Sequence, residues 1–290
     1  MGKKIISYSL WGNSPMYTIG AIRNAELAET IYPGWICRFY VGDDVAEDIV
    51  NKLKSFDNTE VIVMKNTMPD WQKTIWRFYA INNEGVDFVI LRDTDSRLTL
   101  REYEAVLEWQ LSGKYFHIMR DHPYHTEAIM AGMWGCKPKE LMDRINEEIY
   151  TKNGLDTISN FSEVIDDWLI QEKKNIADQK QNHLKPEQLV TKGIDQILLR
   201  SLIYPMVVSD AYIHDSYPQY NCFSGRFDYQ YNTRCKKEVN TGFPSRRGRV
   251  QDQWNNFVGQ VFDENDIPVK EYSELLMQRD KCIYMDWATE

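Results

Sequence analysis

Two aspartates, Asp93 and Asp95, are the residues whose type and spacing most clearly predict chemistry. They follow an unbroken apolar run in the stretch VDFVILRDTDSR, residues 86–97. Carboxylates two positions apart at a strand end can contact one hard cation, directly or through water, and leave positions free for diphosphate oxygens. Such an ion also neutralises the charge that develops on a diphosphate leaving group. The pair therefore predicts a Mn²⁺ or Mg²⁺ site.

The elements that must position this pair alternate between strands and helices. Apolar runs predict strands at residues 3–11, 35–42, 59–65 and 86–96. Apolar residues at helical spacing predict helices at residues 14–34, 45–56 and 71–85. This alternation indicates an α/β fold with a mostly parallel central sheet that helices flank on both faces. Ligands of such sheets bind beyond the carboxyl ends of the strands, where the two aspartates fall.

The composition narrows the functional classes. The chain has 290 residues, 43% of them apolar, and lacks a membrane-spanning tract of about 18 consecutive apolar residues. We expect a soluble cytoplasmic protein, because no signal sequence opens it. A net charge of −9 disfavours nucleic acid as a partner. The five scattered cysteines form no CxxC pair, so we expect reduced thiols without a zinc site or a disulfide framework.

The aspartate pair has three other interpretations. An EF-hand loop beginning at Asp93 needs glycine at position 6, where Leu98 stands. A phosphatase of the haloacid dehalogenase type usually has Thr or Val two residues after the second acid, where this chain has Arg97. An acidic turn in which Asp95 or Ser96 caps the next helix is compatible with metal binding and stays open.

The order of a first strand, VILRDTDSR, AGMWG, GIDQILL and IHDS resembles the GT-A fold of nucleotide-sugar-dependent glycosyltransferases, which hold a divalent metal with a DxD motif. RDTDSR is in particular similar to a bacterial and viral group of these enzymes. The resemblance spans roughly residues 3–217. It implies a GT-A-like catalytic domain over 1–217, with a helical insertion or lid at 151–192. Residues 218–290 are expected to form a C-terminal extension packed on the same domain.

The resemblance implies a glycosyltransferase that uses Mn²⁺ or Mg²⁺ to transfer a sugar from a UDP- or GDP-sugar donor to a carbohydrate acceptor. A nucleotidyltransferase that makes a nucleotide sugar is an alternative, but it typically has a Gly-rich loop with Arg and Lys after the first strand, which SLWGNSPMY lacks. A non-catalytic sugar- or nucleotide-binding module is a third hypothesis. The sequence leaves open whether transfer is retaining or inverting.

The resemblance assigns metal ligands residue by residue. Asp95 is expected to bind the metal directly, and Asp93 to contact the metal, its water shell or the ribose. His214 stands where several members of the fold supply a third ligand, and a neutral imidazole suits Mn²⁺. The alternative for His214 is a polar histidine without a metal.

The donor is expected to contact several further residues. The segment after the first strand would cover the base and ribose, and arginines near the aspartates would either bind phosphate oxygens or pair with the aspartates. The expected donor-binding residues are Ser7, Leu10, Tyr17, Arg77, Asp93 and Arg97.

The acceptor is expected near a polar cluster that follows a predicted strand at 115–119. Gly132 lets the backbone approach a ligand, and Trp134 offers a flat face on which sugars stack. The expected acceptor contacts are Arg120, His122, Trp134 and Gln196.

Two carboxylates are candidates for catalysis, Asp121 in this polar cluster and Asp195 at the start of a predicted helix at 195–205. In similar glycosyltransferases an Asp-Gln pair such as Asp195–Gln196 faces the donor or the acceptor. The alternative for Asp195 is a helix cap. An inverting enzyme needs a carboxylate base near the acceptor hydroxyl.

Overall fold

The protein forms a central sheet in the order β3-β2-β1-β4-β6-β5-β7-β8. Within the described residues only β6 runs antiparallel to its neighbours, β4 and β5. This mostly parallel sheet confirms the predicted α/β class. The computed structural model describes residues 2–82, 85–122, 125, 127–177, 192–216, 239–244 and 257–269. The strands are β1 (Lys3–Leu10), β2 (Ile36–Gly42), β3 (Thr59–Met64), β4 (Val86–Leu91), β5 (Phe116–Arg120), β6 (Trp134–Cys136), β7 (Ala211–Asp215) and β8 (Asn240–Thr241).

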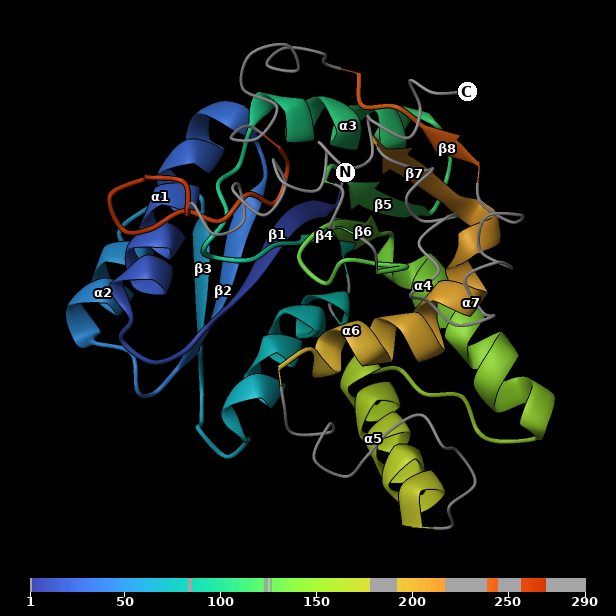
Figure 1. Cartoon of the computed structure of the whole chain (residues 1–290). Helices are drawn as coiled ribbons and strands as arrows, with labels where there is room; N and C mark the ends of the chain where they lie inside the picture. The colour runs from blue at the N-terminus through green and yellow to red at the C-terminus, as the bar shows by residue number, and fades with distance from the viewer. Residues whose placement is uncertain are drawn as a thin grey trace, which may run out of the picture.

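Helices cover both faces of the sheet (Figure 1). One face packs against α1 (Pro15–Ile31), α2 (Glu47–Lys54) and α3 (Leu100–Leu111). The core on the other face includes η1 (Asp70–Asn82), α4 (Pro138–Ile145), α6 (Ile194–Leu198) and α7 (Tyr204–Val207), and α5 (Phe161–Ala177) packs on η1. Central strands are buried on both sides: Ile5 of β1 joins one core and Ile6 the other. This is why the strands read as unbroken apolar runs.

The segment expected as a helix at 71–85 differs from the prediction, because η1 is a series of 3₁₀ turns. Two serines of β1 bind its backbone. Ser9 Oγ accepts from the Arg77 N–H at 2.9 Å and donates to the Thr74 carbonyl at 3.2 Å. Ser7 Oγ donates to the Arg77 carbonyl at 2.7 Å. These contacts engage backbone groups that an α-helix would pair internally.

Residues 257–269, called the C-terminal segment below, lie against the turn that carries the aspartate pair. The Phe262 N–H donates to the Asp95 carbonyl at 2.8 Å, and Ser96 and Val261 form a β-bridge. The helical insertion or lid at 151–192 and the boundary at 217 stay predictions. The structure describes α5 within that insertion, while 178–191 and most of 218–290 lie outside the described residues.

Two further sequence predictions concern cysteines and membranes. Cys37 and Cys136 are buried and unpaired, and the other three cysteines lie outside the described residues. Within the described part of the chain, no helix combines the length and the apolar character needed to cross a bilayer.

Candidate functional site

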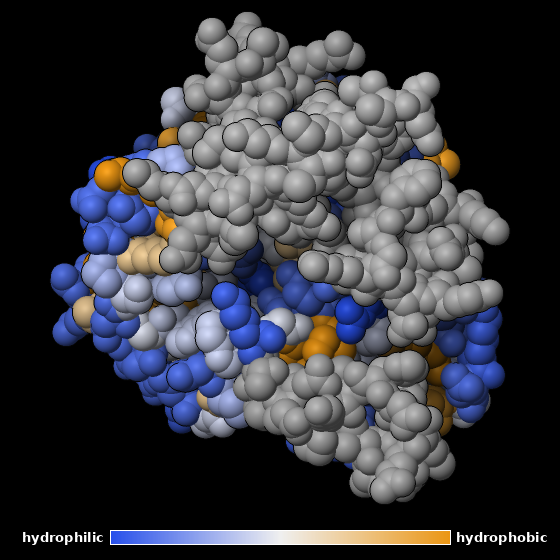
Figure 2. Space-filling view, viewed as in Figure 1, coloured by the Kyte–Doolittle hydropathy of each residue, from blue (hydrophilic) through white to orange (hydrophobic). Residues whose placement is uncertain are grey.

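A pocket of about 630 Å³ opens where β1, β2 and β4 end, a volume suited to a small organic ligand. In the space-filling view the centre of this face is recessed and mainly hydrophilic, with a hydrophobic patch at its rim (Figure 2). The carboxyl ends of parallel strands lie at the same edge of the sheet, so residues far apart in the sequence come together at this edge. The predicted site residues that line the pocket are Leu10, Tyr17, Arg77, Asp93, Asp95, His122, Asp195 and Gln196.

The turn after β4 is held against α1 by a buried asparagine. Asn24 Nδ2 donates to the Thr94 carbonyl at 3.3 Å and to the Ser96 carbonyl at 2.8 Å, and Asn24 Oδ1 accepts from the Leu98 N–H at 3.1 Å. Gly20 makes this close approach possible, since a Cβ there would lie 2.0 Å from the Thr94 oxygen. Backbone contacts therefore fix the turn and leave the aspartate side chains available to the pocket.

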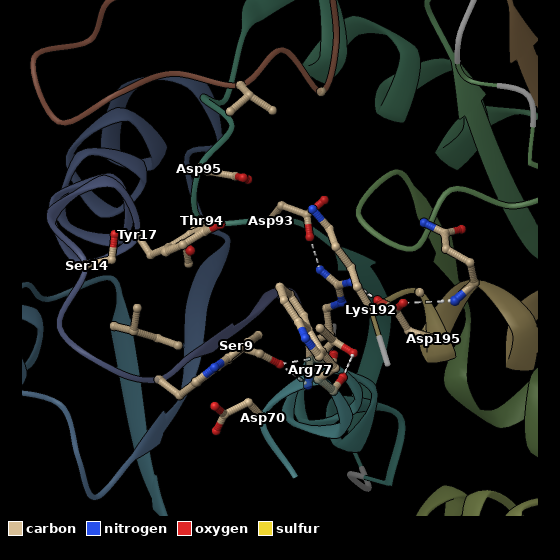
Figure 3. A pocket seen from close by; sticks show the side chains of 18 of the residues that line it. Ser9, Ser14, Tyr17, Asp70, Arg77, Asp93, Thr94, Asp95, Lys192 and Asp195 are labelled. Atoms are coloured by element: carbon tan, nitrogen blue, oxygen red, sulfur yellow. Dashed lines mark hydrogen bonds and ion pairs between the residues drawn. The ribbon is translucent and has the colours of Figure 1, made fainter. Parts of the chain in front are cut away.

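Arg77 connects Asp93, in the turn after β4, to Asp195 of α6 (Figure 3). Its guanidinium, which is buried, pairs with Asp93 and donates from Nη2 to Asp195 Oδ2 at 2.6 Å. Gly132 makes room for Asp93, because a Cβ at that position would lie 1.9 Å from Asp93 Oδ2. Asp93 and Asp195 thus share one buried cation, and an added Cβ at Gly132 would displace the Asp93 carboxylate from its present position.

The electrostatics of the pocket favour a bound cation. Burial raises the pKa of Asp95 to about 7, and the negative charge of Asp93 adds to the rise. Burial also raises the pKa of Asp195, although Arg77 opposes the shift. Among the described residues of the lining, the acidic side chains outnumber the basic ones. The acids are Asp44, Asp70, Asp93, Asp95 and Asp195, and the bases are Arg77 and Lys192.

The chemistry of these side chains fits a divalent metal. Asp93 and Asp95 project into the same cavity and offer the carboxylate oxygens that Mg²⁺ and Mn²⁺ accept (Figure 3). The described residues contain no group of three or more His, Cys, Asp or Glu side chains able to hold an ion. Two carboxylates supply part of the coordination shell of such an ion, and water or a bound ligand would supply the rest.

One wall of the pocket is aromatic. Trp11 follows β1, and Trp71 stands at the start of η1, with the two ring centroids 6.5 Å apart in an edge-to-face arrangement. Tyr17 lines the same pocket from α1. Flat π-faces suit a nucleobase or a sugar ring. Lys192 lies over the Trp71 ring, with Nζ 5.6 Å from its centroid.

The other end of the pocket contains neutral imidazoles. His122 packs on Phe257 of the C-terminal segment with ring centroids 4.1 Å apart, and His125 lies 5.2 Å from His122. Burial lowers the pKa of His122 to about 2 and that of His125 to about 3, so both rings are uncharged at neutral pH. This end offers polar but neutral contacts.

Asp121, one of the two predicted catalytic carboxylates, does not line the pocket. Arg101 donates to Asp121 from Nε to Oδ2 at 2.6 Å and from Nη2 to Oδ1 at 2.7 Å, and the Val258 N–H donates to Asp121 Oδ2 at 3.0 Å. Ser216 Oγ donates to its other oxygen. These contacts anchor the C-terminal segment to β5. A catalytic role for Asp121 stays a prediction that its position does not favour.

His214 also lies away from the aspartate pair. Its Nε2 is 3.0 Å from Glu108 Oε2, and its Nδ1 is 2.8 Å from His117 Nε2. Both ring nitrogens are engaged, so a metal ligand at His214 would have to give up one of these contacts. The structure does not bring the third predicted ligand to the pocket.

Two predicted acceptor contacts are buried in the interior instead. Trp134 packs edge to face on Phe78, with centroids 5.9 Å apart and 1% of the residue exposed, so it presents no face to a sugar. Arg120 donates to Asp215 at 2.7 Å and to the Ala128 carbonyl at 2.8 Å. Both residues support the sheet rather than the pocket.

The structure gives Arg97 and Ser7, two of the predicted donor-binding residues, partners outside the pocket. Arg97 donates to Asp266 at 2.8 Å and to the Asp263 carbonyl at 3.0 Å, which ties the turn to the C-terminal segment and not to the pocket. Ser7 lies behind Arg77 and binds its backbone. The helix after the aspartates is capped by Thr99, which accepts from the Glu102 N–H at 3.2 Å, and not by Asp95 or Ser96.

Sequence reasoning missed several residues that line the pocket. Trp11 directly follows β1 and Asp44 lies two residues after the end of β2, so the rule that located the aspartate pair would have found them too. Trp71, Lys192 and Phe257 carry no such signal, because other parts of the chain bring them to the pocket.

Neither a protein-family model nor the sequence of a curated protein matches the chain. Among solved structures, it is similar to the galactosyltransferase LgtC in complex with donor and acceptor sugar analogues, with 12% identity, a TM-score of 0.42, and coverage of 86% of this chain and 92% of that one. It is also similar to glucosyl-3-phosphoglycerate synthase from Mycobacterium tuberculosis in complex with Mn²⁺, UDP-glucose and glycerol 3-phosphate, with 13% identity, a TM-score of 0.34, and coverage of 49% and 59%.

A third similar structure is 4-diphosphocytidyl-2C-methyl-D-erythritol synthase from Anaerococcus prevotii, with 10% identity, a TM-score of 0.34, and coverage of 50% of this chain and 74% of that one. These likenesses concern the fold alone, so the chemistry of this chain must be argued from its own residues.

Proposed function

We propose that the chain is a metal-dependent glycosyltransferase that transfers a sugar from a nucleoside diphosphate sugar to a carbohydrate acceptor. The observation that carries the proposal is the position of Asp93 and Asp95 at the end of β4, in a pocket that Trp11 and Trp71 also line. An acidic pocket accepts a diphosphate only with an added cation, and aromatic faces suit a base or a sugar.

In this proposal Asp95 and Asp93 hold Mn²⁺ or Mg²⁺. The bound ion would neutralise the charge of the departing nucleoside diphosphate. Arg77 and Gly132 orient Asp93, while the hydrogen bond from Phe262 fixes the backbone of Asp95. Leu10, Tyr17 and the tryptophan pair would contact the base and ribose, because they line the pocket beside the end of β1.

The proposed catalytic carboxylate is Asp195. It lines the pocket, is buried, and is held by Arg77 at 2.6 Å. From there it would either accept the proton of the acceptor hydroxyl or stabilise positive charge on the sugar in the transition state. Gln196 Oε1 accepts from the Ala131 N–H at 3.2 Å, which leaves its amide nitrogen for a hydroxyl of donor or acceptor. His122 adds a neutral polar contact.

The direct test is turnover. UDP- and GDP-sugars are incubated with the protein and Mn²⁺, and release of the nucleoside diphosphate is measured with and without a chelator. Asp95→Asn should abolish release while the circular dichroism spectrum is retained, and Asp48→Asn on the exposed face of α2 is the matched control. Release that survives both the chelator and Asp95→Asn would exclude the proposed metal site. Formation of a nucleotide sugar from a nucleoside triphosphate and a sugar phosphate would instead show a nucleotidyltransferase.

A further inference from the structure

The positive charges of the pocket differ in how they are engaged. Arg77 is 4% exposed and already contacts Asp93 and Asp195, so two carboxylates neutralise its charge. Lys192, the other basic residue of the described lining, is exposed, and within the described part of the chain it forms no ion pair with a carboxylate. Its charge is therefore available to an incoming anion.

The position of Lys192 directs this charge at the aspartate pair. The side chain extends past Trp71, with Nζ 5.6 Å from the ring centroid, and points toward Asp93 in the close-up view (Figure 3). Lys192 thus stands between Trp71 and Asp93.

The backbone next to Lys192 fixes this arrangement. Gly193 has φ of 93°, a left-handed conformation that glycine adopts without strain, and it lines the pocket itself. Two residues later Asp195 pairs with Arg77. One short segment therefore presents to the same cavity the proposed catalytic carboxylate and an ammonium group that pairs with no carboxylate of the described residues.

We infer that Lys192 binds the diphosphate of the donor and that, before the donor arrives, its ammonium group competes with the metal ion for Asp93 and Asp95. This inference rests on the proposed function. With a divalent ion on the aspartates, like-charge repulsion moves the ammonium away from them, and diphosphate oxygens become its partner. Lysine suits this role because its flexible stem carries a compact charge with three donors.

The inference has an unusual signature, since removal of one side chain changes two affinities in opposite directions. Lys192→Gln should weaken binding of inorganic pyrophosphate with Mn²⁺ by about 10- to 100-fold, the range for losing one hydrogen bond to a charged group. The same variant should bind Mn²⁺ alone about two- to tenfold more tightly, because the lysine ammonium no longer repels the metal ion through the screening solvent. Lys192→Arg should stay close to the original protein in both.

The experiment is calorimetric titration of the full chain and its variants with Mn²⁺ alone, then with pyrophosphate, UDP and GDP in the presence of Mn²⁺. Lys54→Gln on the exposed side of α2 removes the same charge away from the pocket and should change none of the affinities. If Lys192→Gln alters the pyrophosphate affinity by less than about twofold, Lys192 is a surface lysine stacked on Trp71 and the inference is overturned. If that affinity falls but Mn²⁺ alone binds as before, the competition for the aspartates is overturned.

Failure of the inference and of the proposed function give different results. If UDP or GDP binds with Mn²⁺ and Lys192→Gln binds it equally well, the glycosyltransferase proposal stands and the role of Lys192 is refuted. If pyrophosphate binding depends on Lys192 but neither nucleotide binds more tightly than pyrophosphate, the role of Lys192 stands and the nucleotide-sugar donor is refuted.

Discussion

Replacement of Arg77 by methionine tests the buried ion pairs through which Arg77 connects Asp93 to Asp195. The substitution removes the cation that pairs with Asp195 and Asp93 and keeps much of the apolar volume. Arg77 and Asp195 side chains are 5% and 7% exposed, and breaking a buried pair by removing one partner costs about 3–5 kcal/mol. The Asp93 side chain is 49% exposed, so its pair adds less than about 1 kcal/mol.

The free energy of unfolding of Arg77→Met should therefore fall by about 3–5 kcal/mol, which for a chain of this length lowers Tm by about 5–8 °C. Urea unfolding followed by circular dichroism, together with scanning calorimetry, measures both quantities. The double variant Arg77→Met/Asp195→Asn should be more stable than Arg77→Met alone, because an amide leaves no uncompensated charge in the interior.

Two results would refute this reasoning. A loss of less than about 1 kcal/mol in Arg77→Met would show that solvent reaches Asp195 and that the pair is not buried in solution. A double variant no more stable than Arg77→Met would show that the loss comes from packing rather than from an unpaired carboxylate.

Three further predictions concern the surroundings of the pocket. Gly132→Ala should displace the Asp93 carboxylate and weaken Mn²⁺-dependent diphosphate binding, measured by calorimetry, at least about tenfold. Gly242→Ala is the control, because an added Cβ there meets nothing within 4 Å, and it should leave the affinity unchanged. Equal affinities of the two variants would contradict the contact between Gly132 and Asp93. The pKa of His125 is about 3 against an ordinary 6.5, so its neutral ring contributes stability that is complete above about pH 6.5 and lost as the pH falls toward 3. At pH 5 this loss is about 2 kcal/mol, and His125→Asn should flatten the urea-unfolding profile by that amount, whereas identical profiles would disprove burial of the ring. Asp121→Ala should cost about 3–4 kcal/mol and speed amide exchange in the C-terminal segment, and unchanged exchange would show that this carboxylate does not anchor it.

The sequence predicted the fold and the aspartate turn because both rest on local signals. Buried parallel strands are unbroken apolar runs, so their ends can be located without knowledge of their partners. The carboxyl-end rule then places Asp93 and Asp95 in the ligand crevice, and the structure puts both in the pocket lining.

The residues that sequence reasoning misplaced depend on long-range packing. Trp134 faces the core because β6 pairs antiparallel with β4, opposite Leu91, and no local pattern specifies that register. His214 is turned away by Glu108, which lies 106 positions earlier in the chain. A short apolar segment with a polar residue does not reveal which face that residue occupies.

Residues that position the site were missed for the same reason. Asn24 reads as one polar residue on an amphipathic helix, yet its side chain holds the turn after β4 across about 70 positions of sequence. Lys192 reads as part of a polar stretch, and only the packing of α6 beside η1 brings it over Trp71.

Calorimetric titration of the protein with UDP, GDP and CDP, each with and without Mn²⁺, tests whether Asp93 and Asp95 form a metal-dependent donor site. At least one nucleoside diphosphate should bind only when the metal is present, and Asp95→Asn should lose this binding while remaining folded. Equal binding with and without Mn²⁺, or no binding of any of the three, would contradict a metal-dependent donor site at Asp93 and Asp95.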